Sequence, residues 1–218
     1  MLDRAVNMVV IWLDGIIMAN RNENSPAARV NRAWTEIETL IGTLDAKQLD
    51  RLAPPATDAQ IDELSRSIGL NLPPDLKAHL KRHNGCLGDE VFIRFHFLST
   101  QSIASHTRKN RKEQKTWLEE NPGESLEFVD GGWTDLSLAI GVSDAAGMEL
   151  TVELPDCETA IPHLRAPVNY AMPLARDFAT YLESFAHHLR NGNFVNEFGT
   201  LEFDHWAEWA VDADPNAR

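Results

Sequence analysis

The residues whose types and spacing could bind a metal ion are His79 and His83, which lie four positions apart in a stretch with helical periodicity. Histidines at i and i+4 project from one face of a helix, so both rings could reach the same ion. The stretch lacks the glutamate of an HExxH site, and no third ligand is evident. His187 and His188 are adjacent and point to different sides of a helix. We expect no metal site, and we expect His79 and His83 to be a surface or half-buried pair.

Signals for nucleophilic or phosphate chemistry are equally sparse. Cys86 could act as a nucleophile, but a catalytic cysteine needs a base within reach and a lowered pKa, and nothing local supplies them. The run 130–133 (Asp-Gly-Gly-Trp) predicts a turn, since no Lys-Ser or Lys-Thr follows to form a phosphate loop. No Gly-x-Ser-x-Gly elbow is present, although a Ser-His-Asp triad assembled from distant residues stays open. The sequence thus favours a protein without catalytic residues or cofactors.

The charge of the chain favours a protein partner over nucleic acid. The 218 residues include 20 basic and 33 acidic side chains, for a net charge of −13. Phosphate backbones require a basic footprint, whereas an acidic protein is attracted to a basic one; acidity also serves solubility alone. The one dense basic run lies within 103–120, which has helical character, and we interpret it as a solvated helix face. Its members are Arg108, Lys109, Arg111, Lys112 and Lys115.

The apolar run 6–18 is the only segment that raises the question of a membrane. It contains Asp14 and is shorter than the ~20 residues that a spanning helix needs. No cluster of positive charges precedes it, and no clear cleavage site follows. The two cysteines, Cys86 and Cys157, make no disulfide framework and fit a reducing compartment. We therefore expect a cytoplasmic protein with no membrane contact, in which 6–18 is part of the fold.

Two capped helices in 53–85 are the clearest elements that could position a site. Thr57 and Gln60 have the spacing of a capping box, and Gly69 fits the left-handed residue that ends a helix. Pro74 fits the first turn of a second helix, which Asn84-Gly85 ends. Apolar residues recur at helical spacing in both segments. They are Ile61, Leu64 and Ile68 in the first helix and Leu76 and Leu80 in the second.

The remaining pattern predicts helices at both ends of a set of strands. Helices are expected from Ser25-Pro26 to about Gly42, over 103–120 and over 174–190. Alternation predicts strands over 91–98, 126–129, 133–142 and 148–154, the last with an acidic outer face, and 155–173 is expected to be loop. We predict a single α+β domain with a mostly antiparallel or mixed sheet of about four to six strands flanked by helices.

The order and spacing of these motifs resemble the SUKH superfamily, the Smi/Knr-type immunity and cell-wall-regulator proteins. The resemblance begins near Val30 and extends to Gly192, most of the chain. It includes a preceding Trp-x-x-Ile-Glu helix, a helix ending in Ile-Gly, a Leu-Pro turn and a terminal Asn-Gly. It also includes Leu98-Ser99 before a helix and an Asp-Phe start to the last helix. The residues that carry it are Trp34, Ile37, Glu38, Ile68-Gly69, Leu72-Pro73, Asn84-Gly85, Leu98-Ser99 and Asp177-Phe178.

This resemblance implies a non-enzymatic immunity protein that binds a cognate bacterial toxin, such as a basic nuclease, and occludes its active site. A regulatory scaffold of the Smi/Knr type is the alternative, and an enzyme with a concealed site is a third class. We expect an N-terminal apolar extension (1–24) packed on the domain, a SUKH-like domain (25–192) and an acidic aromatic extension (193–218). The sequence does not predict an oligomeric state. The candidate partner-binding residues are Trp117, Trp133, Glu149, Glu153, Asp156 and Glu158.

Overall fold

The computed structural model describes residues 23–87, 95–122, 133–143, 149–155, 160–166 and 170–192. Three predicted segments lie wholly outside these ranges: the apolar run 6–18, the strand 126–129 and the extension 193–218. Residues 91–94 of the predicted strand 91–98 and residues 130–132 of the predicted turn 130–133 also lie outside them. The helices are α2 (Pro26–Leu44), the 3-10 helix η1 (Ala46–Arg51), α3 (Asp58–Ile68), α4 (Pro74–Arg82), α5 (Thr100–Glu120) and α6 (Phe178–Arg190). The strands are β1 (Phe95–Phe97), β2 (Ser137–Ser143), β3 (Glu149–Glu153), β4 (Ile161–Ala166) and β5 (Tyr170–Pro173).

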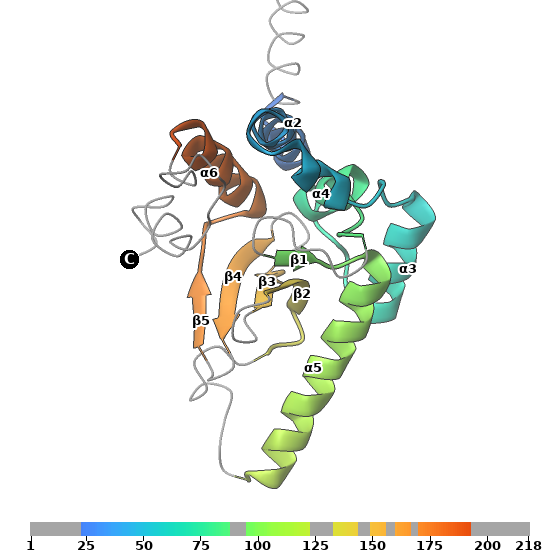
Figure 1. Ribbon diagram of the computed structural model, residues 1–218. Helices are drawn as coiled ribbons and strands as arrows, with labels where there is room; N and C mark the ends of the chain where they lie inside the picture. Colours follow the sequence, from blue (N-terminus) through green and yellow to red (C-terminus); the bar gives the residue numbers. More distant parts are fainter. Residues whose placement is uncertain are drawn as a thin grey trace, which may run out of the picture.

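The five strands form one antiparallel sheet in the order β1-β2-β3-β4-β5. Each strand pairs with its neighbour in the chain, and the register between β2 and β3 shifts at Ala139/Gly141. The helices α2, α4 and α6 gather at one end of the sheet, while α5 runs along its side (Figure 1). The predicted α+β fold, with a largely antiparallel sheet flanked by helices, is confirmed.

The expectation that 155–173 is loop-rich is wrong for much of the segment, because β4 and β5 lie within it. Pro162 lies opposite Val152 and lacks an N–H, yet its carbonyl accepts a hydrogen bond from the Leu174 N–H at 2.9 Å. Pro173 is the last residue of the edge strand β5, where a missing donor costs little. The prolines therefore stand at positions of the sheet that tolerate them, and their number did not indicate a loop.

Two element boundaries also differ from those predicted. The strand expected from residue 133 begins at Ser137, because the chain first turns: the Ser137 N–H donates to the Thr134 carbonyl at 3.1 Å. The last helix begins at Phe178 and not at residue 174, because Asp177 caps it by accepting from the Thr180 N–H at 2.6 Å.

The helix pair α3–α4 forms as its capping residues predict. The Thr57 hydroxyl accepts from the Gln60 N–H at 3.3 Å, and the Gln60 side chain accepts from the Thr57 N–H at 2.8 Å. Gly69 ends α3 in the left-handed conformation, with φ of 73°. Gly85 follows α4 with φ of 84°, and the Asn84 side chain accepts from the Thr100 N–H at 2.8 Å. This bond ties the end of α4 to the start of α5.

The core lies between α2, α4, α6 and the sheet. Trp34 of α2 is completely buried and contacts the rings of Phe97 and His79, and Phe178 of α6 contacts His79. At the edge of this core Arg29 of α2 reaches α6. Its guanidinium donates to Asp177, Thr180 and Glu183 of α6. In the ranges given above, no helix is long and apolar enough to cross a membrane.

Candidate partner-binding surface

The helix α5 is the element that organises the candidate surface. Ser99 caps its start by accepting from the Ser102 N–H at 3.2 Å. Along its first half, Ile103, Ala104 and Thr107 are buried, and the Thr107 hydroxyl accepts from the Ala139 N–H of β2 at 3.4 Å. Its second half is polar and more exposed. The helix is thus attached to the sheet at one end and presents side chains beside it at the other.

Two side chains in the middle of α5 form hydrogen bonds to β2, to β3 and to the segments next to them. The Asn110 amide donates to both carboxylate oxygens of Glu149, at 3.1 and 3.0 Å. The Arg111 guanidinium donates to the carbonyls of Ile68 at 3.1 Å, of Ser137 at 3.4 Å and of Asp135. Burial lowers the pKa of Arg111, an effect that the nearby Asp135 and Glu153 oppose.

The predicted acidic outer face of β3 is not an open surface. Glu149, Thr151 and Glu153 share that face, as strand alternation requires, but Thr151 is completely buried. Glu149 is held by Asn110, and Glu153 accepts from the hydroxyls of Thr134, at 2.9 Å, and of Ser137. The reason is that α5 packs on this face. Both glutamates remain half-buried and internally bonded, and their role toward a partner stays a prediction.

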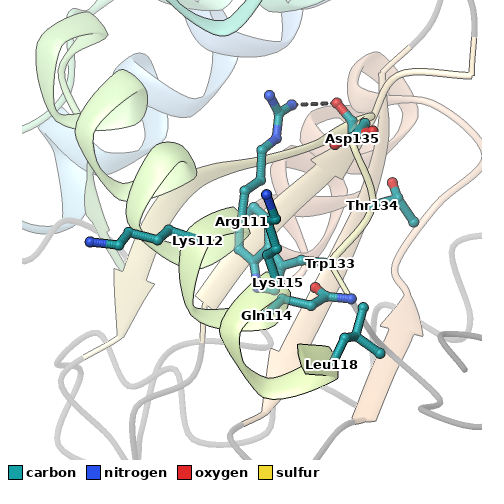
Figure 2. Close-up of a pocket in the computed structure, with 8 residues that line it drawn as sticks. All are labelled: Arg111, Lys112, Gln114, Lys115, Leu118, Trp133, Thr134 and Asp135. Carbon is teal, nitrogen blue, oxygen red and sulfur yellow. Dashed lines mark hydrogen bonds between the residues drawn. The ribbon is translucent and has the colours of Figure 1, made fainter. Parts of the chain in front are cut away.

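A groove of about 460 Å³ lies between the second half of α5 and the segment 133–135. The α5 residues that line it recur at i, i+3, i+4 and i+7, so they form one helix face; Lys112 lies beside them. Figure 2 shows Trp133 behind this face and Asp135 next to the Arg111 guanidinium. The lining consists of Arg111, Lys112, Gln114, Lys115, Leu118, Trp133, Thr134 and Asp135.

Two exposed apolar residues are neighbours in the chain of residues that line the groove. Trp117 precedes the lining residue Leu118 and is 38% exposed, while Leu136 follows Asp135 and is 41% exposed. Trp133 is half-buried and packs against the core. The structure thus places the predicted residue Trp133 in the groove and Trp117 on the helix that forms its wall. Asp156 and Glu158 lie outside the described residues.

The basic run of α5 is mostly solvated, as predicted, with Arg111 as the exception. Lys112 has no ion-pair partner within the described ranges. The Lys115 ammonium lies 3.9 Å from Glu119, and the Lys109 ammonium 3.8 Å from Glu113, in pairs that are largely exposed to water. Such pairs hold their partners weakly, so the lysines at the groove remain available.

Gln114 is the residue of this surface that the sequence did not indicate. Its Nε2 and Oε1 atoms are both buried, and neither has a hydrogen-bond partner in the structure. In Figure 2 its side chain points away from α5 toward the side on which Leu118 and Thr134 lie. A spacing signal was present, because Asn110, Gln114 and Leu118 recur every four residues and share one helix face.

Comparison with known proteins decides the family. The model of the SMI1 / KNR4 family (SUKH-1) matches residues 55–184, from the start of α3 to the middle of α6. The chain belongs to the SMI1 / KNR4 family (SUKH-1). No curated protein matches the chain. Membership in this family is compatible with an immunity protein or with a Smi/Knr-type regulator.

Several of the residues on which the predicted resemblance was based have structural partners, both inside the matched range and before it. The Glu38 carboxylate accepts from the Arg82 Nε at 2.6 Å and lies 2.8 Å from the His83 Nε2. These two contacts join α2 to the end of α4. Burial opposes ionisation of Glu38, but hydrogen bonds from Arg82 and His83 hold its pKa below the usual range. Trp34 donates a hydrogen bond to His79, and the Asn84 side chain accepts one from the Thr100 N–H. These contacts join α2, which precedes the matched range, to α4, and they join the end of α4 to the start of α5.

The structure corrects one expectation about the histidines. His79 is completely buried and not at or near the surface, because its ring lies between Trp34, Phe97 and Phe178. Its partner in the predicted pair, His83, is half-buried and bonded to Glu38. The Cys86 thiol accepts from the Phe97 N–H at 3.3 Å. No group of three metal-ligating side chains occurs among the residues that the structure describes.

Proposed function

We propose that this SUKH-1 protein is a non-enzymatic, cytoplasmic immunity protein that binds a cognate bacterial toxin and occludes its active site. The observation that carries the proposal is a groove beside α5 that Trp133 lines, with Trp117 exposed on the same helix and Leu136 exposed next to the lining residue Asp135, on an acidic member of this family. Aromatic side chains are the residues that most often anchor a protein interface, since they bury a large area with little loss of rotamer freedom.

The net charge supports a basic partner. A charge of −13 gives the molecule a field that accelerates encounter with a positively charged protein. Toxins that cleave nucleic acid fit this description, because their substrate carries a phosphate at every nucleotide. A stable complex would bury about 1,600 Å² in total. The exposed Trp117 and Leu136 supply apolar contact for such an interface, and the net negative charge of the molecule attracts the partner.

Co-expression with the protein encoded beside this chain tests the proposal. The expected result is survival of the host and co-purification of the two proteins as one complex. A matched pair of variants locates the surface: Trp117→Ser and Leu44→Ser remove side chains of nearly equal exposure, 38% and 39%, from α5 and from α2. We expect Trp117→Ser alone to weaken the complex and the protection.

Two results would contradict the proposal in different ways. A toxic neighbour that stays toxic, or a neighbour that forms no complex with the wild-type chain, would rule out the immunity role for that pair. Equal behaviour of the Trp117→Ser and Leu44→Ser variants in a complex that does form would move the interface away from α5. If the chain instead binds proteins of cell-wall synthesis or signalling, the regulatory role within the same family takes precedence.

A further inference from the structure

We propose that the groove beside α5 binds an extended acidic peptide segment that carries an aromatic or aliphatic side chain and is supplied by a partner protein. The inference goes beyond the immunity role, because it assigns the chemistry of the ligand from the groove itself. It holds for any partner that presents such a segment and does not require the partner to be a toxin.

The charge of the groove has the opposite sign to that of the molecule. Among the residues that the structure describes, three cationic side chains and one carboxylate line it, whereas the whole chain carries a net charge of −13. Lys112 and Lys115 are exposed and lie three residues apart on α5, so their ammonium groups can approach one ligand together. A local positive site on a negative protein selects an acidic segment that the rest of the surface repels.

The floor of the groove offers apolar contact between these charges. Trp133 is half-buried, with part of its ring packed on the core, and Leu118 faces the groove from the last turns of α5. An indole held in this way loses little further freedom when a ligand side chain packs on it. A segment in which an aromatic or aliphatic residue lies between carboxylates would match this order of cations and apolar surface.

The side-chain amide of Gln114 favours a peptide over a phosphate ligand. It presents one donor, Nε2, and one acceptor, Oε1, and both are buried without partners. A buried amide that lacks partners is unfavourable, so a ligand that satisfies both atoms gains from it. A peptide group carries an N–H and a C=O and can satisfy both. A phosphodiester has no donor to offer to Oε1, although the groove is cationic.

The experiment measures binding of the full chain to a labelled synthetic peptide of alternating glutamate and phenylalanine, by fluorescence anisotropy at low and at physiological salt. Two control peptides replace the glutamates by lysine or the phenylalanines by serine. We expect the acidic aromatic peptide to bind more tightly than either control, by about tenfold or more, and to weaken as salt screens the lysines.

Paired charge reversals locate the site. The Lys112→Glu/Lys115→Glu variant should lower the affinity about tenfold or more, since both attractions become repulsions. The Lys47→Glu/Lys81→Glu variant changes the net charge equally at exposed positions of η1 and α4, outside the groove lining, and should leave the affinity within about twofold. Gln114→Leu should weaken binding of the peptide without lowering the thermal stability of the protein. This result would distinguish a ligand contact of Gln114 from a structural role.

Several outcomes would overturn the proposal. Equal loss in the two charge-reversal variants would show a general charge effect. Binding of a single-stranded oligonucleotide that depends on Lys112 and Lys115, with no binding of the peptide, would assign the site to nucleic acid. If the peptide binds only when Glu202, Asp204 and Glu208 are changed to neutral residues, the occupant is the chain's own C-terminal segment. Concentration-dependent self-association abolished by the Lys112 and Lys115 reversals would assign it to a second copy.

Discussion

The indole Nε1 of Trp34 donates a hydrogen bond to Nδ1 of His79 at 3.1 Å, and the two rings stack with centroids 5.6 Å apart. Because an indole nitrogen can only donate, the His79 Nδ1 must accept, and the imidazole carries its proton on Nε2. The ring is completely buried, and burial, aided by the charge of His83, lowers the pKa of His79 to about 3. Neutral His79 is therefore part of the folded core.

This relationship predicts a pH dependence of stability. In the unfolded chain a histidine has its ordinary pKa of about 6.5, so between pH 6.5 and 3 the unfolded state binds the proton and the folded state does not. Stability falls as the pH drops below 6.5, by up to about 1.4 kcal/mol per pH unit. Urea unfolding between pH 7 and 5, above the range in which Glu38 and Asp177 titrate, measures the slope.

The His79→Asn variant provides the control for this slope. The Asn side chain can place its oxygen near the position of Nδ1 and keep the bond to Trp34, although it leaves space where the rest of the ring was. We expect the variant to be less stable at pH 7 but to lose less stability between pH 7 and 5. An unchanged slope would mean that other groups cause it.

Two glycines with the same backbone preference should differ strongly in their tolerance of alanine. Gly69 and Gly85 both have positive φ, at 73° and 84°. A Cβ at Gly69 meets no atom within 4 Å, whereas one at Gly85 would lie 2.6 Å from the Ser99 nitrogen and 2.7 Å from the Phe97 oxygen. Gly69→Ala should cost about 1–2 kcal/mol of conformational strain. Gly85→Ala should cost more or prevent folding; similar denaturation midpoints for the two variants would refute this difference.

Loss of Arg29, which is bonded in a largely buried network, should cost more stability than loss of a lysine in an exposed ion pair. Arg29 donates to Asp177 and Glu183, with Arg29 and Asp177 less than one-fifth exposed, and these carboxylates raise its pKa against the effect of burial. Arg29→Met should reduce the free energy of unfolding by about 1–3 kcal/mol. Lys81→Met removes the exposed pair with Asp58 and should change it by less than about 1 kcal/mol. Equal effects in chemical denaturation would argue against a role of Arg29 in holding α2 to α6.

Gln114→Leu should stabilise the protein. The substitution removes two buried polar atoms that have no partner and leaves apolar methyl groups one bond closer to the backbone. Relieving one such group is worth about 1–3 kcal/mol, so an increase in the melting temperature is expected. Asn110→Leu is the comparison, because Asn110 lies one turn earlier and is bonded to Glu149. That variant should be destabilised, and a fall in stability for both would show that the Gln114 amide is satisfied in solution.

The parts of the fold that the sequence predicted are those specified by neighbours in the chain. The caps at Thr57 and Ser25 lie within three residues of the groups they bind, so spacing alone indicates them. The strand that contains Pro162 escaped prediction because its pairing partners lie on other strands: Pro162 pairs with Val152 of β3, and His163 pairs with Pro173 of β5. Local pattern carried no information about these contacts.

The candidate surface was predicted in part for the same reason. Tryptophans are conspicuous in a polar stretch, and Trp133 does lie at the groove. Alternation correctly placed Glu149 and Glu153 on one face of β3, but only the packing of α5 reveals that this face is covered. The buried state of His79 likewise depends on Trp34, 45 residues earlier in the chain.

The position of α2 sets a limit on how this protein can be divided. The family match begins at residue 55 and ends at residue 184, whereas Trp34, Ile37 and Ile41 of α2 are completely buried against the matched part, and Phe185 and Leu189 complete the buried face of α6. A fragment cut at the limits of the match would expose to water the apolar surface that α2 covers and would lose part of the buried face of α6. We expect such a fragment to be insoluble. The smallest fragment worth expressing therefore starts before the Ser25 cap and continues through Gly192.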